Sequence, residues 1–180
     1  LLKNKKTGIY KDIEEMRKNT ITKLGENIQI RRYVLKKQTN SNYISGYIHN
    51  GKIGAMVTLK NKDEQLSKDI SMQIVASNPL ALDYNSVDSK ILADEKEIYK
   101  AELEKLNKKD DIKRNIIEGK IKKFLNNNTL LDQPFIKDEK TTLRKIIKKN
   151  EIIDYTRYNL GEGLKKEEED FAKEVYKQIK

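Results

Sequence analysis

The chain has 180 residues, of which 38 are Lys or Arg and 28 are Asp or Glu, so its formal net charge is +10. It contains no cysteine, which excludes disulfides and thiolate metal sites, and its single histidine nearly excludes sites built on histidine clusters. No apolar run approaches the roughly 20 residues of a membrane-spanning helix. We therefore expect a soluble protein with no membrane partner, no cofactor, no metal and no catalytic residues.

The first part of the chain predicts a helix followed by a strand. Apolar residues recur at helical spacing over residues 11–24, and Gly25 stands where a left-handed C-terminal cap belongs. Apolar and polar residues then alternate over residues 28–35, which predicts a strand. A polar loop joins this strand to the next predicted element.

Residues 43–59 predict a β-hairpin, and we expect the core to be organised around it. Asn50-Gly51 is the dipeptide that a type I′ turn prefers, because both central residues need a positive φ. A two-residue turn pairs Ile48 with Ile53 and places an apolar set on one face of the hairpin. With the strand before it, the hairpin completes a three-stranded antiparallel meander.

The middle of the chain predicts three helices. The Asn-x-x-Glu spacing at residues 61–64 indicates a capping box, and the helix that it starts must end at Asn78-Pro79. Two further helices are expected over about 87–106 and 112–125, joined by a short turn into an antiparallel helical hairpin. These two helices cannot bury both apolar faces between themselves, so the core or another molecule must cover the rest.

The last part of the chain returns to sheet and then to helix. Residues 130–136 are strand-like, and Pro134 indicates an edge position. A helix is expected over 141–149 and a strand over 151–160, which is rich in β-forming residues. After a glycine-rich break, residues 164–180 predict a final helix.

Two signals for ligands are weak. Gly46 to Lys52 has the spacing of a phosphate-binding loop, but Ile53 replaces the hydroxyl residue and no helix follows. His49 lies at the hairpin tip without an identifiable catalytic partner, so we interpret it as an exposed contact residue.

The positive charge could attract a polyanion, yet the lysines are mixed with acids and Trp is absent, so no specific nucleic acid is expected. A basic RNA- or ribosome-associated module, supported by charge and by Arg31-Arg32, is the alternative.

An ordered series of segments resembles the translation elongation factor Ts family. The series is IEEMRKNTITKLGENIQIRRY from Ile13, the hairpin YIHNGKIGAMV, SMQIVASNP from Ser71, IIEGKIKKFLNNNTLLDQPFI from Ile116, and YTRYNLGEGLKKEEEDFAKEV from Tyr155. It covers nearly the whole chain. The resemblance implies an α+β fold: an antiparallel sheet core packed with helices, an inserted helical hairpin of coiled-coil type, and a C-terminal helix.

The resemblance also implies a domain plan, an activity and a location. The expected parts are the first part of the core (1–82), the helical-hairpin dimerisation subdomain (83–131), the return to the core sheet (132–163) and the C-terminal helical module (164–180). The implied activity is guanine-nucleotide exchange on elongation factor Tu, without bond chemistry, with a possible homodimer through the helical hairpin. We expect a cytoplasmic protein of an AT-rich bacterium, or alternatively a plastid or mitochondrial matrix protein.

The contact residues are assigned by the same resemblance. It implies that elongation factor Tu meets the core at His49, Asn50 and Gly51, and meets the C-terminal helix at Phe171, Val175 and Ile179, although these last three could equally form an intramolecular stripe. The family's Thr-Asp-Phe-Val motif and small N-terminal domain are not in this sequence. If this chain is the whole molecule, we expect weak binding and poor exchange.

Overall fold

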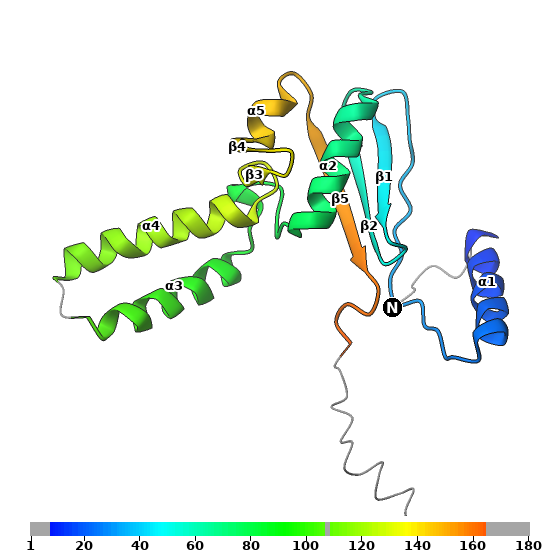
Figure 1. Ribbon diagram of the computed structural model, residues 1–180, viewed down its shortest axis with the longest axis horizontal. Helices are drawn as coiled ribbons and strands as arrows, with labels where there is room; N and C mark the ends of the chain where they lie inside the picture. The colour runs from blue at the N-terminus through cyan, green and yellow to red at the C-terminus, as the bar shows by residue number, and fades with distance from the viewer. Residues whose placement is uncertain (1–7, 107–108, 165–180) are drawn as a thin grey trace, which may run out of the picture. The chain divides into compact units, whose positions relative to one another are not determined.

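The computed structural model describes residues 8–106 and 109–164 (Figure 1). The chain divides into two units, Leu1–Lys37 and Gln38–Lys180, and each is described by itself. The described part contains five α-helices, a three-stranded antiparallel sheet and a two-stranded sheet. The predicted α+β class is confirmed. None of the helices in this part is long and apolar enough to span a membrane.

The first unit contains helix α1 (Gly8–Leu24), as the apolar spacing predicts. Gly25 ends it with φ +71°, and the Gly25 N–H donates to the carbonyl oxygen of Ile21 at 2.8 Å. The following strand prediction is wrong, because residues 28–35 form no ladder with any described residue. Alternating residues favour an extended backbone, but a strand also needs a neighbouring strand to satisfy its hydrogen bonds.

The sheet of the second unit has the strand order β1-β2-β5, with both pairs antiparallel. Strands β1 (Tyr43–His49) and β2 (Ile53–Leu59) form the predicted hairpin, and β5 (Ile152–Asn159) confirms the strand predicted near the end of the chain. The prediction that residues 28–35 and the hairpin form a three-stranded meander is therefore wrong. The third strand comes from the distant residues 152–159, which gives β2 a partner on both edges (Figure 1).

The hairpin turn agrees with the prediction but its register does not. Asn50 and Gly51 both have positive φ, at 49° and 66°. Lys52 also belongs to the loop, so His49 pairs with Ile53 and every later pair is displaced by one residue. Because side chains alternate between the faces of a strand, this shift turns Ile48 away from the core, and its side chain is 71% exposed.

Helix α2 (Glu64–Ser77) packs on one face of β1 and β2 (Figure 1). Its N-cap is Asp63, whose carboxylate accepts from the Leu66 N–H at 2.9 Å, so the capping box predicted from Asn61 is replaced by a cap two residues later. The core collects buried side chains from the sheet, α2 and the segment that follows the helical hairpin. They include Ala55, Val57, Leu59, Ile70, Ile74, Leu130, Phe135, Leu143 and Ile152.

The segment after the helical hairpin forms a small second sheet, β3 (Pro134–Phe135) with β4 (Asp138–Thr142), and then the short helix α5 (Leu143–Ile147). The edge position of Pro134 is confirmed. The helix predicted over 141–149 is shorter than expected because its first two residues belong to β4 or to the cap, and a turn ends it at Ile147.

The predicted helical hairpin is present as α3 (Ser89–Glu104) and α4 (Asp110–Asn128), preceded by a 3₁₀ turn, η1 (Tyr84–Ser86). The two helices lie side by side and extend away from α2 and the sheet (Figure 1). Their base is fixed by backbone hydrogen bonds between residues 80–82 and 128–131, at 2.8–3.0 Å. Next to these residues in the chain, Asp132 accepts two parallel hydrogen bonds from Arg144, at 2.7 and 2.8 Å. The final predicted helix lies outside the described residues.

Candidate protein-binding site

The tip of the β1–β2 hairpin brings together three of the residues assigned to partner contact. His49, Asn50 and Gly51 are all exposed, and the Lys52 N–H closes the turn by donating to the His49 carbonyl oxygen at 3.0 Å. Positive φ at two successive residues is the backbone of a type I′ turn, which suits the right-handed twist of the strands. The tip is thus a short, firmly closed projection of the sheet.

A chain of side-chain hydrogen bonds orders the tip. The Tyr47 Oη lies 3.2 Å from His49 Nδ1, and His49 Nε2 lies 3.2 Å from Asn50 Nδ2. The tyrosine and imidazole rings are tilted by 41°, with centroids 6.2 Å apart. Both imidazole nitrogens are therefore engaged, so the ring is held in one orientation and a partner meets a surface that is already ordered.

Exposed apolar residues precede the turn and follow β5. The Leu160 N–H donates to the Lys52 carbonyl oxygen at 2.8 Å, which ties the residues after β5 to the hairpin loop. Ile48, Leu160 and Leu164 are 71%, 76% and 63% exposed. Large apolar residues grouped around polar ones are typical of protein contact surfaces. We call these three residues and His49, Asn50 and Gly51 the tip surface.

Sequence reasoning identified only the polar half of the tip surface. It assigned Ile48 to the buried face, because a two-residue turn gives the wrong register, and it did not single out Leu160 or Leu164. The signal for Leu160 was its position between the last strand and a glycine-rich break. The other assigned contact residues, Phe171, Val175 and Ile179, lie outside the described residues.

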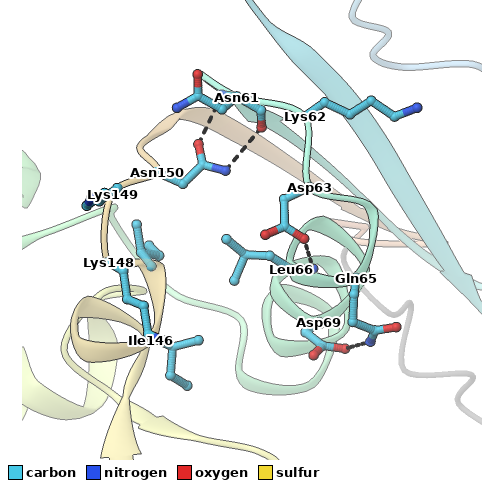
Figure 2. Close-up of a pocket in the computed structure, with 11 residues that line it drawn as sticks. Asn61, Lys62, Asp63, Gln65, Leu66, Asp69, Ile146, Lys148, Lys149 and Asn150 are labelled. Atoms are coloured by element: carbon cyan, nitrogen blue, oxygen red, sulfur yellow. Dashed lines mark hydrogen bonds between the residues drawn. The ribbon is translucent and has the colours of Figure 1, made fainter.

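A second feature is an open groove of about 640 Å³ between the start of α2 and the end of α5 (Figure 2). At one end of the groove Asn150 joins the two segments, accepting from the Asn61 N–H at 3.0 Å and donating to the Asn61 carbonyl oxygen at 3.1 Å (Figure 2). The two carboxylates that line the groove already have partners. Asp63 caps α2, and Asp69 accepts from Gln65 and Lys137 at 2.7 and 2.5 Å. These polar groups serve the fold, so the groove is not the better candidate.

Metal chemistry finds no support in the described ranges, 8–106 and 109–164, where no three His, Asp or Glu side chains gather closely enough to hold an ion. The P-loop-like spacing from Gly46 to Lys52 is confirmed as a false signal, because its residues form a strand and a turn instead of a loop before a helix. The exposed tip surface is the feature that offers a specific contact.

The helical hairpin carries a separate set of exposed apolar residues. Ile98, Leu106 and Ile112 are about half exposed, whereas Leu103 is buried. Across the hairpin, Lys120 pairs with Glu102 and lies 4.9 Å from the centroid of the Tyr99 ring. These charged and aromatic contacts join α3 to α4, whereas Ile98, Leu106 and Ile112 remain exposed.

Comparison with known proteins identifies the family of the chain. The sequence matches the model of the family described as Elongation factor TS over residues 1–162. The chain belongs to this family. It is 40% identical to elongation factor Ts of Francisella tularensis subsp. novicida (strain U112) over 177 residues, which are 97% of this chain and 60% of that protein. It is 38% identical to elongation factor Ts of Methylococcus capsulatus (strain ATCC 33009 / NCIMB 11132 / Bath) over 170 residues, 93% of this chain and 58% of that protein. The chain thus spans about 60% of the length of these relatives.

Two of the segments that resemble the elongation factor Ts family meet inside the core. Gln73 belongs to SMQIVASNP and Gln133 to LLDQPFI. The Gln73 Nε2 donates to Gln133 Oε1 at 2.6 Å and to the Pro134 carbonyl oxygen at 3.0 Å, while Gln73 Oε1 accepts from the Ile136 N–H at 2.7 Å. These residues therefore hold α2 to the second sheet.

Proposed function

We propose that this chain promotes the release of GDP from elongation factor Tu during polypeptide elongation, acting in the cytoplasm. Membership of the elongation factor Ts family, matched over residues 1–162, carries this proposal. The ordered tip surface supports it, because an exchange factor must press a rigid element against its partner. The reaction makes and breaks no covalent bond, so it needs no catalytic side chains.

The physical basis of exchange is thermodynamic linkage. If the chain weakens the hold of elongation factor Tu on GDP by some factor, GDP must weaken the hold of Tu on the chain by the same factor. The chain then binds best to a Tu molecule whose nucleotide site is distorted. It accelerates release without selecting the nucleotide that binds next.

We assign one contact with Tu to the tip surface and a second to Phe171, Val175 and Ile179. His49 is held by Tyr47 and Asn50, so little conformational entropy is lost when it becomes buried. Ile48 and Leu160 supply apolar area beside it. Polar groups of fixed direction next to apolar area give an interface both specificity and affinity.

The test measures the release of a fluorescent GDP analogue from elongation factor Tu, with and without the chain. We expect acceleration by the unmodified chain and a loss of about tenfold for His49→Ala, which corresponds to about 1.4 kcal/mol of binding. Asn40→Ala is the control. Asn40 is exposed like His49, but it lies in the loop before β1, at the end of the strand opposite the tip. Acceleration unchanged by His49→Ala contradicts the assignment of the tip.

An unmodified chain that neither binds Tu nor accelerates release contradicts the proposed function itself. The alternative of a basic RNA- or ribosome-associated module then predicts RNA binding that weakens steeply with salt, by an amount set by the phosphates contacted. Binding to Tu through the tip surface should depend less steeply on salt, because none of the six residues of this surface is Lys or Arg.

The helical hairpin supports a second proposal, a homodimer formed through its exposed face. Ile98 lies in α3 and Ile112 in α4, Leu106 follows the end of α3, and all three are apolar and exposed. Sedimentation of the unmodified chain should show a dimer, and Ile112→Lys should shift it to the monomer. Lys113→Ala is the control for helix α4. A mass that does not change in Ile112→Lys contradicts this interface.

A further inference from the structure

We propose that the open groove between the start of α2 and the end of α5 binds an acidic peptide segment of a partner protein, one that carries a large apolar side chain between its carboxylates. The groove has a volume of about 640 Å³. Binding sites for small ligands usually measure about 300–1,000 Å³, so a segment of a few residues fits this volume. The groove is separate from the tip surface, and the proposal does not depend on elongation factor Tu.

The inner surface of the groove is apolar. Ile147 is 9% exposed and belongs to the core, while Leu66 and Ile146 are partly buried and pack against that core. Leu66 points from α2 toward the wall of the groove that carries Ile146 and Lys148 (Figure 2). These side chains offer apolar contact area to a side chain of the partner, and removing both surfaces from water is favourable.

The charges that the fold leaves unpaired in the groove are positive. The two carboxylates that line it already accept hydrogen bonds within the fold, and Lys62 pairs with Glu64 at 2.8 Å. Lys148 and Lys149 are exposed, and no hydrogen bond or ion pair with another described residue engages their ammonium groups. The groove therefore presents two free ammonium groups beside its apolar surface, and these attract carboxylates.

The backbone of Lys148 supports a task for its side chain. Its φ of 53° and ψ of −104° form a conformation that costs free energy for any residue with a Cβ. Glycine would avoid this cost. Such strain is found mainly at functional sites, where a side chain serves binding at the expense of stability. A ligand of opposite charge accounts for a lysine at this position.

The lining of the groove favours a peptide over a nucleic acid. Of the eleven described residues that line it, none is aromatic and none is arginine. Bases therefore find no ring on which to stack, and phosphates find no guanidinium for paired hydrogen bonds. Carboxylates on either side of an apolar residue match both features, the two ammonium groups and the apolar inner surface.

The groove is formed without a ligand. Asn150 bonds both backbone groups of Asn61, and the Lys60 N–H donates to the Glu151 carbonyl oxygen at 2.9 Å, so the segment after β2 is tied to the segment before β5. A site that is formed in advance loses little conformational entropy on binding. The groove begins after the end of β2, whereas the turn of the tip surface precedes the start of this strand, so a peptide in the groove leaves the turn accessible.

The experiment follows the fluorescence anisotropy of a labelled peptide, Glu-Asp-Leu-Glu-Asp, as the intact chain is added at low salt. We expect saturable binding that weakens as salt is added. Lys148→Glu and Lys149→Glu should each weaken it about fivefold, and replacing the leucine of the peptide by serine should weaken it about tenfold. Lys145→Glu is the matched control, because Lys145 is an exposed lysine of α5 that does not line the groove.

Lys148→Gly separates binding from folding. This variant should be more stable than the unmodified chain and yet bind the peptide about threefold more weakly, a loss that misfolding does not explain. Amide NMR signals locate the peptide, and those of residues 61–66 and 146–150 should shift when it is added.

The proposal is overturned if Lys148→Glu binds the peptide as tightly as Lys145→Glu, or if the peptide shifts the amide signals of other residues instead. It is overturned in favour of a nucleic acid if a short oligouridine RNA occupies the groove more tightly than the peptide does. It is overturned in favour of a second copy of this chain if dilution of the chain alone shifts the signals of the groove.

Discussion

Replacing Gln73 by leucine tests whether a buried amide pair holds α2 to the second sheet. Gln73 is only 1% exposed, and it joins Gln133, Pro134 and Ile136 through three hydrogen bonds of 2.6–3.0 Å. Leucine has a similar volume, so the substitution removes the hydrogen bonds without leaving a large cavity. The main effect is therefore electrostatic.

The magnitude follows from which partners remain buried. Gln133 is 2% exposed, and its Oε1 loses its donor in a dry environment, which costs about 1–3 kcal/mol. The Pro134 carbonyl and the Ile136 N–H are only partly buried and can turn to water, so each adds less. Burying leucine in place of an amide recovers part of this cost. We expect Gln73→Leu to lower the free energy of unfolding by about 2 kcal/mol.

The reciprocal substitution should behave differently. In Gln133→Leu, Gln73 Nε2 keeps the Pro134 carbonyl at 3.0 Å and the Ser77 hydroxyl at 3.4 Å as acceptors. The substitution also removes Gln133 Nε2, a buried donor without a partner in the described structure. We expect a change within about 1 kcal/mol. The double variant should be more stable than Gln73→Leu alone, because the orphaned acceptor is gone.

Urea denaturation followed by circular dichroism measures all three variants, with equal slopes as the condition for comparing midpoints. The reasoning is refuted if Gln133→Leu destabilises as much as Gln73→Leu, or if the two effects simply add. Either result would mean that the contacts of each side chain act independently and that the shared hydrogen bond contributes little.

Three further predictions concern the turn after α5, the last strand and the base of the helical hairpin. Lys148→Gly should stabilise the chain by about 1 kcal/mol, because Lys148 has φ 53° and ψ −104°, a strained backbone for any residue with a Cβ. Burial raises the pKa of Tyr155 to about 12, and its hydroxyl donates to the Pro79 carbonyl oxygen at 2.9 Å. The folded state keeps this proton longer, so stability should fall as pH rises from about 10 to 12, and Tyr155→Phe should reduce that fall. Arg144→Lys should cost about 1 kcal/mol, because one ammonium cannot reproduce the paired hydrogen bonds to Asp132.

Matched controls separate these effects from general ones. Lys149 is the next residue and does not have a positive φ, so Lys149→Gly should not stabilise the chain. An equal gain in stability from Lys149→Gly would contradict the proposal that the backbone of Lys148 is strained. Tyr33→Phe, on an exposed tyrosine, should leave the alkaline loss of stability unchanged. Arg114→Lys changes an exposed ion pair within α4, and a cost equal to that of Arg144→Lys would deny the paired hydrogen bonds a special role.

Local patterns predicted the elements that depend on nearby residues. The helices α1, α2, α3 and α4 follow from apolar spacing, since a helix satisfies its hydrogen bonds within itself. Gly25 and the Asn50-Gly51 turn follow from the need for positive φ. The family resemblance also depended only on ordered segments of sequence. The polar half of the tip surface was accessible in the same way, because a tight turn exposes its own residues.

The tertiary structure decided whatever depends on residues far apart in the chain. Residues 28–35 have a strand pattern but no described partner, whereas β5 obtains its place from β2, about a hundred residues earlier. The third loop residue, Lys52, sets the register and moves Ile48 to the exposed face, which no count of apolar residues reveals. Gln73 and Gln133 become a pair only when α2 and β3 pack together. The sequence by itself thus determined the helices, the turn and the family. Strand partners, register and the buried amide pair were decided by packing, because their hydrogen bonds and burial are completed by distant segments.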